Sequence, residues 1–284
     1  MEFARVGAQS LAALCTGAAL AFAVPIAVAL IWKFRKKERF TTILVGAATF
    51  LVFALILEKP IQNVLLFPTQ MGLSDHAVSR FFSASPVLLA LVLGLFPGVF
   101  EETGRLVAFS TVLKNRKNRE TSVSHGIGHG GIEVMAILGV TYVTYIAYAV
   151  MINAGTFGTL IEQTAAQAPA QADALCALAG QIAGLTAAGI GMGLLERVFA
   201  VLFHIGASIL VFYACRDKGR LWLYPLAIIL HTAMDFIAAL VIVNVASLST
   251  GALEGIVAAF GILTFCGAYF LLYRKEGGRQ LRNT

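Results

Sequence analysis

Charged side chains are scarce in this sequence. Asp, Glu, Lys and Arg make up only 13% of the 284 residues, about half the share found in a soluble domain. Hydrophobic residues reach 58% and the mean hydropathy is +0.83. This composition excludes an ordinary soluble domain and predicts an all-α, polytopic transmembrane helix bundle that forms one integral membrane domain over residues 1–284.

Cysteine is also rare, and the four copies contain no Cys-x-x-Cys pair: Cys15, Cys176, Cys215 and Cys266. The spacing excludes a zinc ribbon and gives no disulfide framework, so we interpret each as a small packing residue. The glycine-rich stretch 126–131 follows no strand-like segment, which argues against a phosphate-binding loop.

The sequence consists mainly of long apolar runs. Seven segments approach or exceed the roughly 20 helical residues that cross a bilayer: 6–32, 40–57, 85–113, 122–152, 186–215, 221–245 and 253–273. The first run is too long for a secretory signal, so we expect it to be retained as a spanning helix. Glycines four residues apart, at 126/130, 180/184 and 189/193, predict close helix packing.

Basic residues alternate between the loops that join these segments. One set of loops and the C-terminal tail is rich in them: Arg35, Lys36, Lys37, Arg39, Lys114, Arg116, Lys117, Arg119, Arg216, Lys218, Arg220, Arg274, Lys275, Arg279 and Arg282. The other set holds only Arg5, Lys59 and Arg80. The positive-inside rule therefore predicts an outer N-terminus and a cytoplasmic C-terminus. The net charge of +6 lies mainly in these short loops, so it indicates membrane topology and does not predict nucleic-acid binding.

Two of the predicted outer loops are long. They cover residues 58–84 and 153–184, and the second is rich in Ala and Gln. We expect an interfacial helix within the second loop.

Ionisable residues inside the apolar segments lie at one depth. Glu102, Glu133, His204 and His231 each stand 11–13 residues from the adjoining basic loop. At about 1.5 Å per residue, this puts them roughly 16–20 Å from the cytoplasmic helix ends. Buried charge in a membrane is costly and is functional by default. Four segments therefore predict one polar cavity.

Helical spacing supports this convergence. Glu101/Arg105, His129/Glu133 and His231/Asp235 are each four residues apart, and Arg197/His204 are seven apart, so each pair shares a helix face. The neighbours Glu101 and Glu102 diverge by about 100° around a helix. They therefore do not form a shared-proton carboxylate dyad, although Arg105 can reach either.

Histidines and carboxylates in an apolar cavity are suitable ligands for a divalent transition metal, most simply zinc. The candidate ligands are His129, Glu133, His204 and His231. A catalytic zinc activates water, and a nearby carboxylate takes the proton. Asp235, one turn from His231, would orient its imidazole.

The motifs Glu-Glu-x-x-Arg at 101–105, Gly-His-Gly-Gly-x-Glu at 128–133, a lone His204 and His-x-x-x-Asp at 231–235 resemble those of the YhfC family of intramembrane metalloproteases. That family is similar to the PrsW peptidases and to the CAAX-processing and bacteriocin-processing membrane proteases. The resemblance covers about residues 94–235, within a motif-bearing core of about 94–240.

By motif, the resemblance implies a base at Glu101 or Glu102 beside Arg105. It implies a second-helix ligand at Glu133, with His204, His231 and Asp235 completing the site. The CAAX-type pattern has one more residue before the arginine, and a histidine in place of Glu133, so His129 stays a further candidate. The resemblance also implies a multi-pass protein of the bacterial cytoplasmic membrane that cleaves a membrane protein or peptide.

Two other classes of function stay open. Chains of Glu and His also build proton or ion transporters, although no inverted repeat is evident. A non-catalytic membrane scaffold is the third class. For the remaining charged residues we expect structural roles: Glu196 and Arg197 as an ion pair or as partners of opposite helices, and His76 and His125 outside any metal site.

Overall fold

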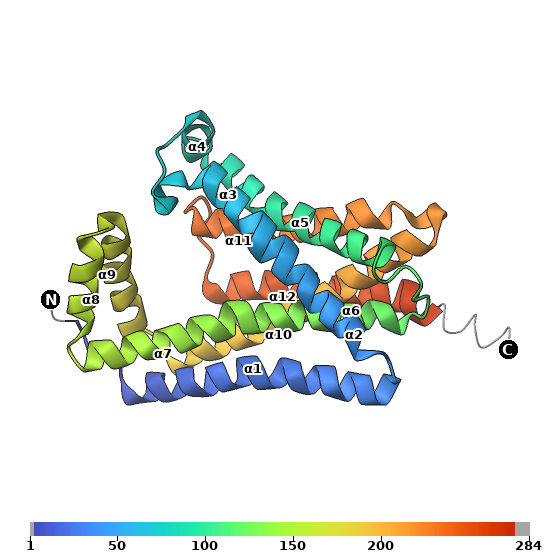
Figure 1. Ribbon diagram of the computed structural model, residues 1–284, viewed down its shortest axis with the longest axis horizontal. Helices are drawn as coiled ribbons and strands as arrows, with labels where there is room; N and C mark the ends of the chain where they lie inside the picture. The colour runs from blue at the N-terminus through green and yellow to red at the C-terminus, as the bar shows by residue number, and fades with distance from the viewer. Residues whose placement is uncertain (1–2, 276–284) are drawn as a thin grey trace.

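The computed structural model describes residues 3–275, and within that range every regular element is helical. Seven helices are long and apolar enough to span a membrane: Ala8–Lys36, Phe40–Leu66, Pro86–Ser110, Glu120–Asn153, Ala187–Arg216, Lys218–Ile242 and Thr250–Tyr273. The predicted all-α bundle of seven spans is confirmed (Figure 1). The predicted basic residues Arg279 and Arg282 lie outside the described residues.

The second span is longer than predicted. It consists of α2 (Phe40–Phe50), a π-helical segment (Leu51–Glu58) and α3 (Lys59–Leu66), whereas the sequence prediction ended it at residue 57. Pro60 does not break it; it lies directly after the π-helical segment, where the backbone hydrogen-bonding pattern changes. Glu58 is consequently fully buried rather than part of an outer loop.

The fourth span, like the second, contains a π-helical segment. α6 (Glu120–Glu133) continues through a π-helical segment (Val134–Gly139) into α7 (Val140–Asn153). Such π-helical insertions occur frequently at functional sites. Here the change of geometry begins directly after Glu133.

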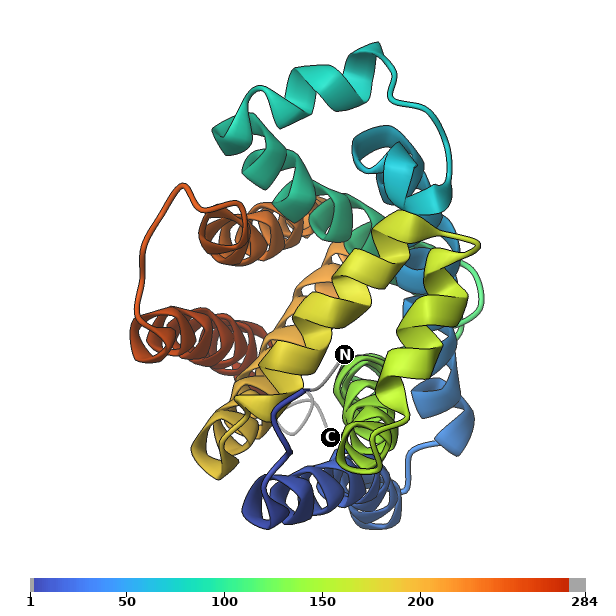
Figure 2. The same cartoon turned by 90° about the vertical axis from the view of Figure 1, so that its left-hand side faces the viewer.

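The two long connections contain short helices. The first includes α4 (Ala77–Ser83), which His76 caps by accepting a hydrogen bond from the Ser79 amide. The second forms a hairpin of α8 (Phe157–Ala165) and α9 (Pro169–Ala183), so helix is present where the sequence predicted it. Figure 2 shows this hairpin at one end of the bundle, on the side of the N-terminus.

The centre of the bundle is α10 (Ala187–Arg216). In its most apolar membrane window 72% of the residues are buried, against at most 39% in the other six spans. Its neighbours include α5 (Pro86–Ser110), α6, α11 (Leu223–Ile242) and α12 (Thr250–Ala268). A helix buried to this extent can hold polar side chains away from lipid, which is what the predicted cavity requires.

Glycines allow the closest of these contacts. A Cβ atom on Gly126 would lie 2.5 Å from Cα of Ile205, and one on Gly130 would lie 3.2 Å from Cα of Val201. The predicted close packing at 126/130 is therefore confirmed. It is wrong at 180/184: Gly180 faces open space, and Gly184 meets only carbonyl oxygens of its own segment.

The close packing predicted for the pair 189/193 is confirmed at Gly193 and is wrong at Gly189. A Cβ on Gly189 would meet only Thr186, and one on Gly193 would meet side chains of the π-helical segment and α7. Tyr142 of α7 also donates a hydrogen bond to the Ile190 carbonyl at 2.9 Å, so the start of α10 packs against α7.

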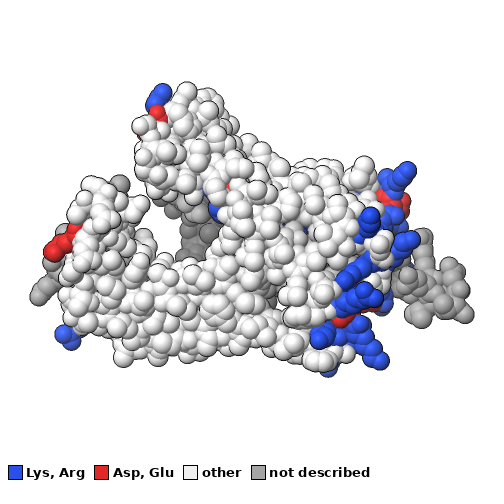
Figure 3. Space-filling view, viewed as in Figure 1, with Lys and Arg blue, Asp and Glu red and all other residues white. Residues whose placement is uncertain are grey.

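Lysine and arginine side chains gather at one end of the molecule, where α1 (Ala8–Lys36) ends (Figure 3). Arg116 bonds both Thr41 and Thr42, and Arg216 donates to the Leu113 and Arg116 carbonyls, so these loops are tied together. The predicted clustering of basic loops at one end is present. The prediction that this end faces the cytoplasm rests on the positive-inside rule.

Candidate metal centre

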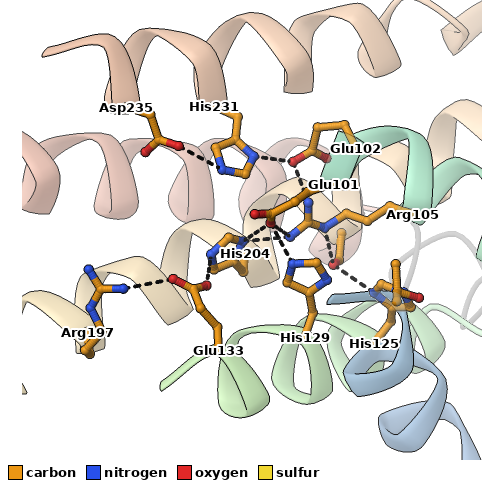
Figure 4. A network of polar contacts seen from close by, with 12 residues as sticks. Glu101, Glu102, Arg105, His125, His129, Glu133, Arg197, His204, His231 and Asp235 are labelled. Atoms are coloured by element: carbon orange, nitrogen blue, oxygen red, sulfur yellow. Dashed lines mark hydrogen bonds and ion pairs between the residues drawn. The ribbon is translucent and has the colours of Figure 1, made fainter. Parts of the chain in front are cut away.

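Four helices bring their ionisable residues into one cluster (Figure 4). The contributors are Glu101, Glu102 and Arg105 from α5; His129 and Glu133 from α6; Arg197 and His204 from α10; and His231 and Asp235 from α11. The ring centroids of His204 and His231 lie 5.5 Å apart, and those of His129 and His204 lie 4.9 Å apart. The shared depth read from the sequence thus corresponds to a meeting in space.

The approach of α5 to α11 depends on small residues one and two turns before the glutamates. A Cβ on Gly94 would come within 2.6 Å of the Phe236 backbone nitrogen, and Gly98 faces Ile228 and Thr232. Pro97 lies between them and leaves the local helical bonding incomplete. This Gly-x-x-Pro-Gly stretch sets the α5 backbone against α11 just before Glu101 and Glu102.

Glu101, His129 and His204 form the group best placed to hold a metal ion. One ligand atom from each lies within 4.8 Å of the other two, and all three residues are buried. In the present arrangement Nε2 of His129 lies 2.8 Å from Oε2 of Glu101. One carboxylate and two imidazoles are the ligand number of a catalytic zinc site.

Arg105 links α5 to α10. Its guanidinium donates to Oε1 of Glu102 at 2.5 Å, to Nδ1 of His204 at 2.7 Å and to Oγ of Ser208 at 3.3 Å. It also lies 3.9 Å from Glu101. The expectation that Arg105 can reach either glutamate is confirmed, with Glu102 as the closer partner.

The two neighbouring glutamates point to different partners, as their helical positions predicted. Glu101 faces His129, whereas Glu102 accepts from Arg105 and from Nδ1 of His231 at 2.8 Å. Asp235 lies 3.5 Å from Nε2 of His231. His231 is thus held between two carboxylates, with Glu102 nearer than the predicted partner Asp235.

Glu133 lies between a histidine and an arginine of α10. Oε2 of Glu133 contacts Nε2 of His204, and Oε1 accepts from Arg197 at 2.9 Å. Arg197 also bonds its neighbour Glu196. Both roles left open for Arg197 therefore occur together: a pair within its own helix and a pair with α6.

The structure distributes the four predicted metal ligands unevenly. His129 and His204 belong to the three-residue group, Glu133 adjoins it through His204, and His231 contacts Glu102. Glu101, expected from the sequence as one of two candidate bases, lies inside the group instead. Sequence spacing predicted that these residues cluster, but it did not show which of them lie close enough together to share a metal ion.

Three buried polar residues extend the cluster beyond the predicted set. His125 is fully buried, its ring centroid lies 6.1 Å from that of His129, and it contacts Ser208 at 3.2 Å and Thr49 at 3.3 Å. The i,i+4 spacing of His125 and His129 was the available signal. The sequence predicts His125 outside any metal site; the structure buries it beside His129, and it is not one of the three residues best placed to hold a metal.

The residues present suit a divalent cation on two further grounds. Carboxylates outnumber guanidinium groups in the cluster, so bound positive charge would offset their repulsion. In addition, Oε2 of Glu102 and Nδ1 of His129 are buried without a hydrogen-bond partner among the described residues. Native proteins seldom leave such atoms unsatisfied unless water, an ion or a reactant completes them.

Comparison with known proteins agrees with this architecture. The model of the YhfC intramembrane metalloprotease family matches residues 20–257, which include all of the cluster. The membrane protein YhfC of Bacillus subtilis (strain 168) is 28% identical over 235 residues, covering 83% of this chain and 86% of its own length. No solved structure matches the chain. Because the family model covers most of the sequence, the chain belongs to the YhfC intramembrane metalloprotease family.

Proposed function

We propose that this protein is a membrane-embedded, metal-dependent peptidase whose metal is held by Glu101, His129 and His204. The observation that carries the proposal is that these three donors, from three helices, lie within 4.8 Å of one another in a buried position. Membership of the YhfC family supports the same activity. Zinc is the simplest ion for this donor set, and when bound it would supply Lewis-acid activation of water and of a carbonyl group.

Glu133 is the carboxylate best suited to accept a proton from the attacking water. It adjoins His204, and Arg197 holds its other oxygen at 2.9 Å. Glu102 is less suited, because its side chain is fully enclosed beside Arg105 and His231, whereas 13% of the Glu133 side chain is exposed. In this proposal Glu102 is a positioning residue that holds α5 to α11.

The proposed reaction is hydrolysis of a peptide bond. The water oxygen adds to the carbonyl carbon while Glu133 takes a proton, and the proton passes to the amide nitrogen as the C–N bond breaks. The products are a carboxylate and an amine. Arg197 keeps the Glu133 side chain in place during both transfers.

The direct test is to purify the protein and measure bound metal and peptide cleavage together. The proposal expects about one metal ion per chain and cleavage of reconstituted single-span peptides, detected by mass spectrometry as new termini. The Glu133→Gln variant is expected to lower cleavage by about 10²–10⁴-fold. Tightly bound metal with no cleavage of any membrane peptide would contradict it and favour a scaffold, and ion flux in liposomes without cleavage would favour a transporter.

A further inference from the structure

The cluster is closed toward the basic end of the bundle. Every residue of α6 from 121 to 131 is buried, and so is every residue of α10 from 203 to 214. Fully buried residues on this side include Arg105, His125 and Ser208. The tight contacts of Gly126 with Ile205 leave no room for a passage between α6 and α10 here.

The same cluster is open toward the opposite end. Side-chain exposure rises from zero at Glu102 to 13% at Glu133, 25% at Glu196 and 32% at Asp235. Figure 3 shows the surface hollowed between the α8–α9 hairpin and the segment around α3 and α4. Charged groups exposed to hydrocarbon would be costly, so we expect this opening to hold water.

Close packing does not extend to every face of α10 at this end. Gly191 faces open space, in contrast to the tightly packed Gly126, whereas Ile190 and Gly193 contact Tyr142 of α7. α6 also gives way to π-helical geometry directly after Glu133. On both α6 and α10, the half near the basic loops is therefore closely packed, and the opposite half is more open.

A second hollow does not offer another route to the metal donors. It is an apolar groove of about 560 Å³ between α1, α6 and α10. Of the ionisable cluster, only Arg197 lines it. An unfolded peptide backbone needs hydrogen-bonding partners that these apolar walls do not supply.

We propose that the substrate enters from the end opposite the basic loops, which is the non-cytoplasmic side under the positive-inside rule. The substrate class is then a membrane-anchored polypeptide whose scissile bond is reached from the outer side of the bilayer, past Asp235 and Glu133. The basic-end halves of α6 and α10 bar entry from the cytoplasm. This inference rests on the proposed peptidase function, but it makes a separate claim about access.

Labelling of single cysteines with a charged, membrane-impermeant methanethiosulfonate tests access without requiring metal or activity. The background replaces Cys15, Cys176, Cys215 and Cys266 with serine. Open-side probes are Glu196→Cys and Asp235→Cys, and sealed-side probes are Ser124→Cys and Ser208→Cys. Lys117→Cys, in a basic loop, marks orientation, and labelling after denaturation in detergent gives the total thiol.

In intact cells the two open-side probes are expected to react about tenfold faster than the sealed-side probes, because thiol modification requires access. In inverted vesicles only Lys117→Cys is expected to react rapidly. The proposal is overturned if Ser124→Cys or Ser208→Cys is labelled rapidly in inverted vesicles, or if both open-side probes are inert in cells. If the variants show this labelling pattern but the parent protein cleaves no peptide, the enzyme proposal is rejected and the access proposal stands.

Discussion

Arg105 donates a hydrogen bond from Nη2 to Nδ1 of His204 at 2.7 Å, joining two residues separated by 99 positions in the chain. A guanidinium group can only donate, so Nδ1 of His204 must accept. In a neutral imidazole the proton then sits on Nε2, which faces Glu133. One arginine thereby sets the tautomer of a candidate metal ligand, and metal binding at His204 must rearrange one of these two contacts.

Removal of Arg105 should destabilise the bundle severely. Breaking a buried ion pair from one side costs about 3–5 kcal/mol, because the partner charge is left uncompensated. We expect Arg105→Ala to lower the midpoint of thermal unfolding in detergent strongly. Arg105→Lys should recover only part of the loss, because lysine cannot reproduce the fork that bonds Glu102, His204 and Ser208.

Arg80→Ala is the matched control for this measurement. Arg80 lies on α4 and bonds an exposed backbone carbonyl, that of Asp75. Its loss should change stability by no more than about 0.5 kcal/mol. Equal midpoints for Arg105→Ala and Arg80→Ala would show that the buried network contributes no stability.

Metal content should depend on the three-residue group. Glu101→Gln, His129→Ala and His204→Ala are each expected to lower the metal bound per chain, as measured by elemental analysis of purified protein. Each change removes one of the three donors that lie within 4.8 Å of one another. His76→Ala, which removes the cap of α4 and a contact with the Val64 carbonyl, should bind as much metal as the parent protein.

The same measurement can reject the assignment. Unchanged metal content in all three variants would exclude this group as the site. Loss of metal in His231→Ala but not in His129→Ala would instead favour the ligand set that the family resemblance implies.

Glu133 and Glu102 should differ in what their loss affects. Glu133→Gln is expected to keep the metal and to lower peptidase turnover by about 10²–10⁴-fold, the usual contribution of a general base. Glu102→Gln is expected to lower the unfolding midpoint, because Arg105 and His231 lose their shared acceptor. If Glu102→Gln folds as stably as the parent protein and binds metal but is inactive, then Glu102 is the base.

Gly94→Ala should push α5 away from α11. The added methyl group would lie within 2.9 Å of the backbone of Phe236 and Thr232, which cannot move aside as a side chain could. Overpacking of this kind costs about 1–3 kcal/mol. Gly191→Ala is the control, because its Cβ meets nothing within 4 Å. A Gly94→Ala protein as stable as Gly191→Ala would contradict the close approach of these helices.

Composition and helical periodicity were sufficient for the class of fold. The scarcity of charge and the seven apolar runs predicted the spans, because each must satisfy its backbone hydrogen bonds within the membrane. Residue counts from the basic loops also predicted that Glu102, Glu133, His204 and His231 share a depth. Depth along a straight helix follows from rise per residue and requires no tertiary information.

In the second span, prediction from composition and periodicity fails. The sequence placed Glu58 outside the membrane because charge and proline follow each other there, but the helix continues and buries the residue. The glycines at 180/184 have the same spacing as those at 126/130, yet only the latter meet another helix. Sequence spacing shows which residues share one face of a helix, but it does not show whether that face packs against another helix.

The sequence by itself determined the membrane bundle and the pairs of ionisable residues on each helix. Only the tertiary structure decided that Glu101 joins His129 and His204, while Glu102 turns to Arg105 and His231. The physical reason is that rotation and spacing between helices are fixed by packing contacts such as those of Gly94 and Gly126. A small change in either would give each carboxylate a different partner.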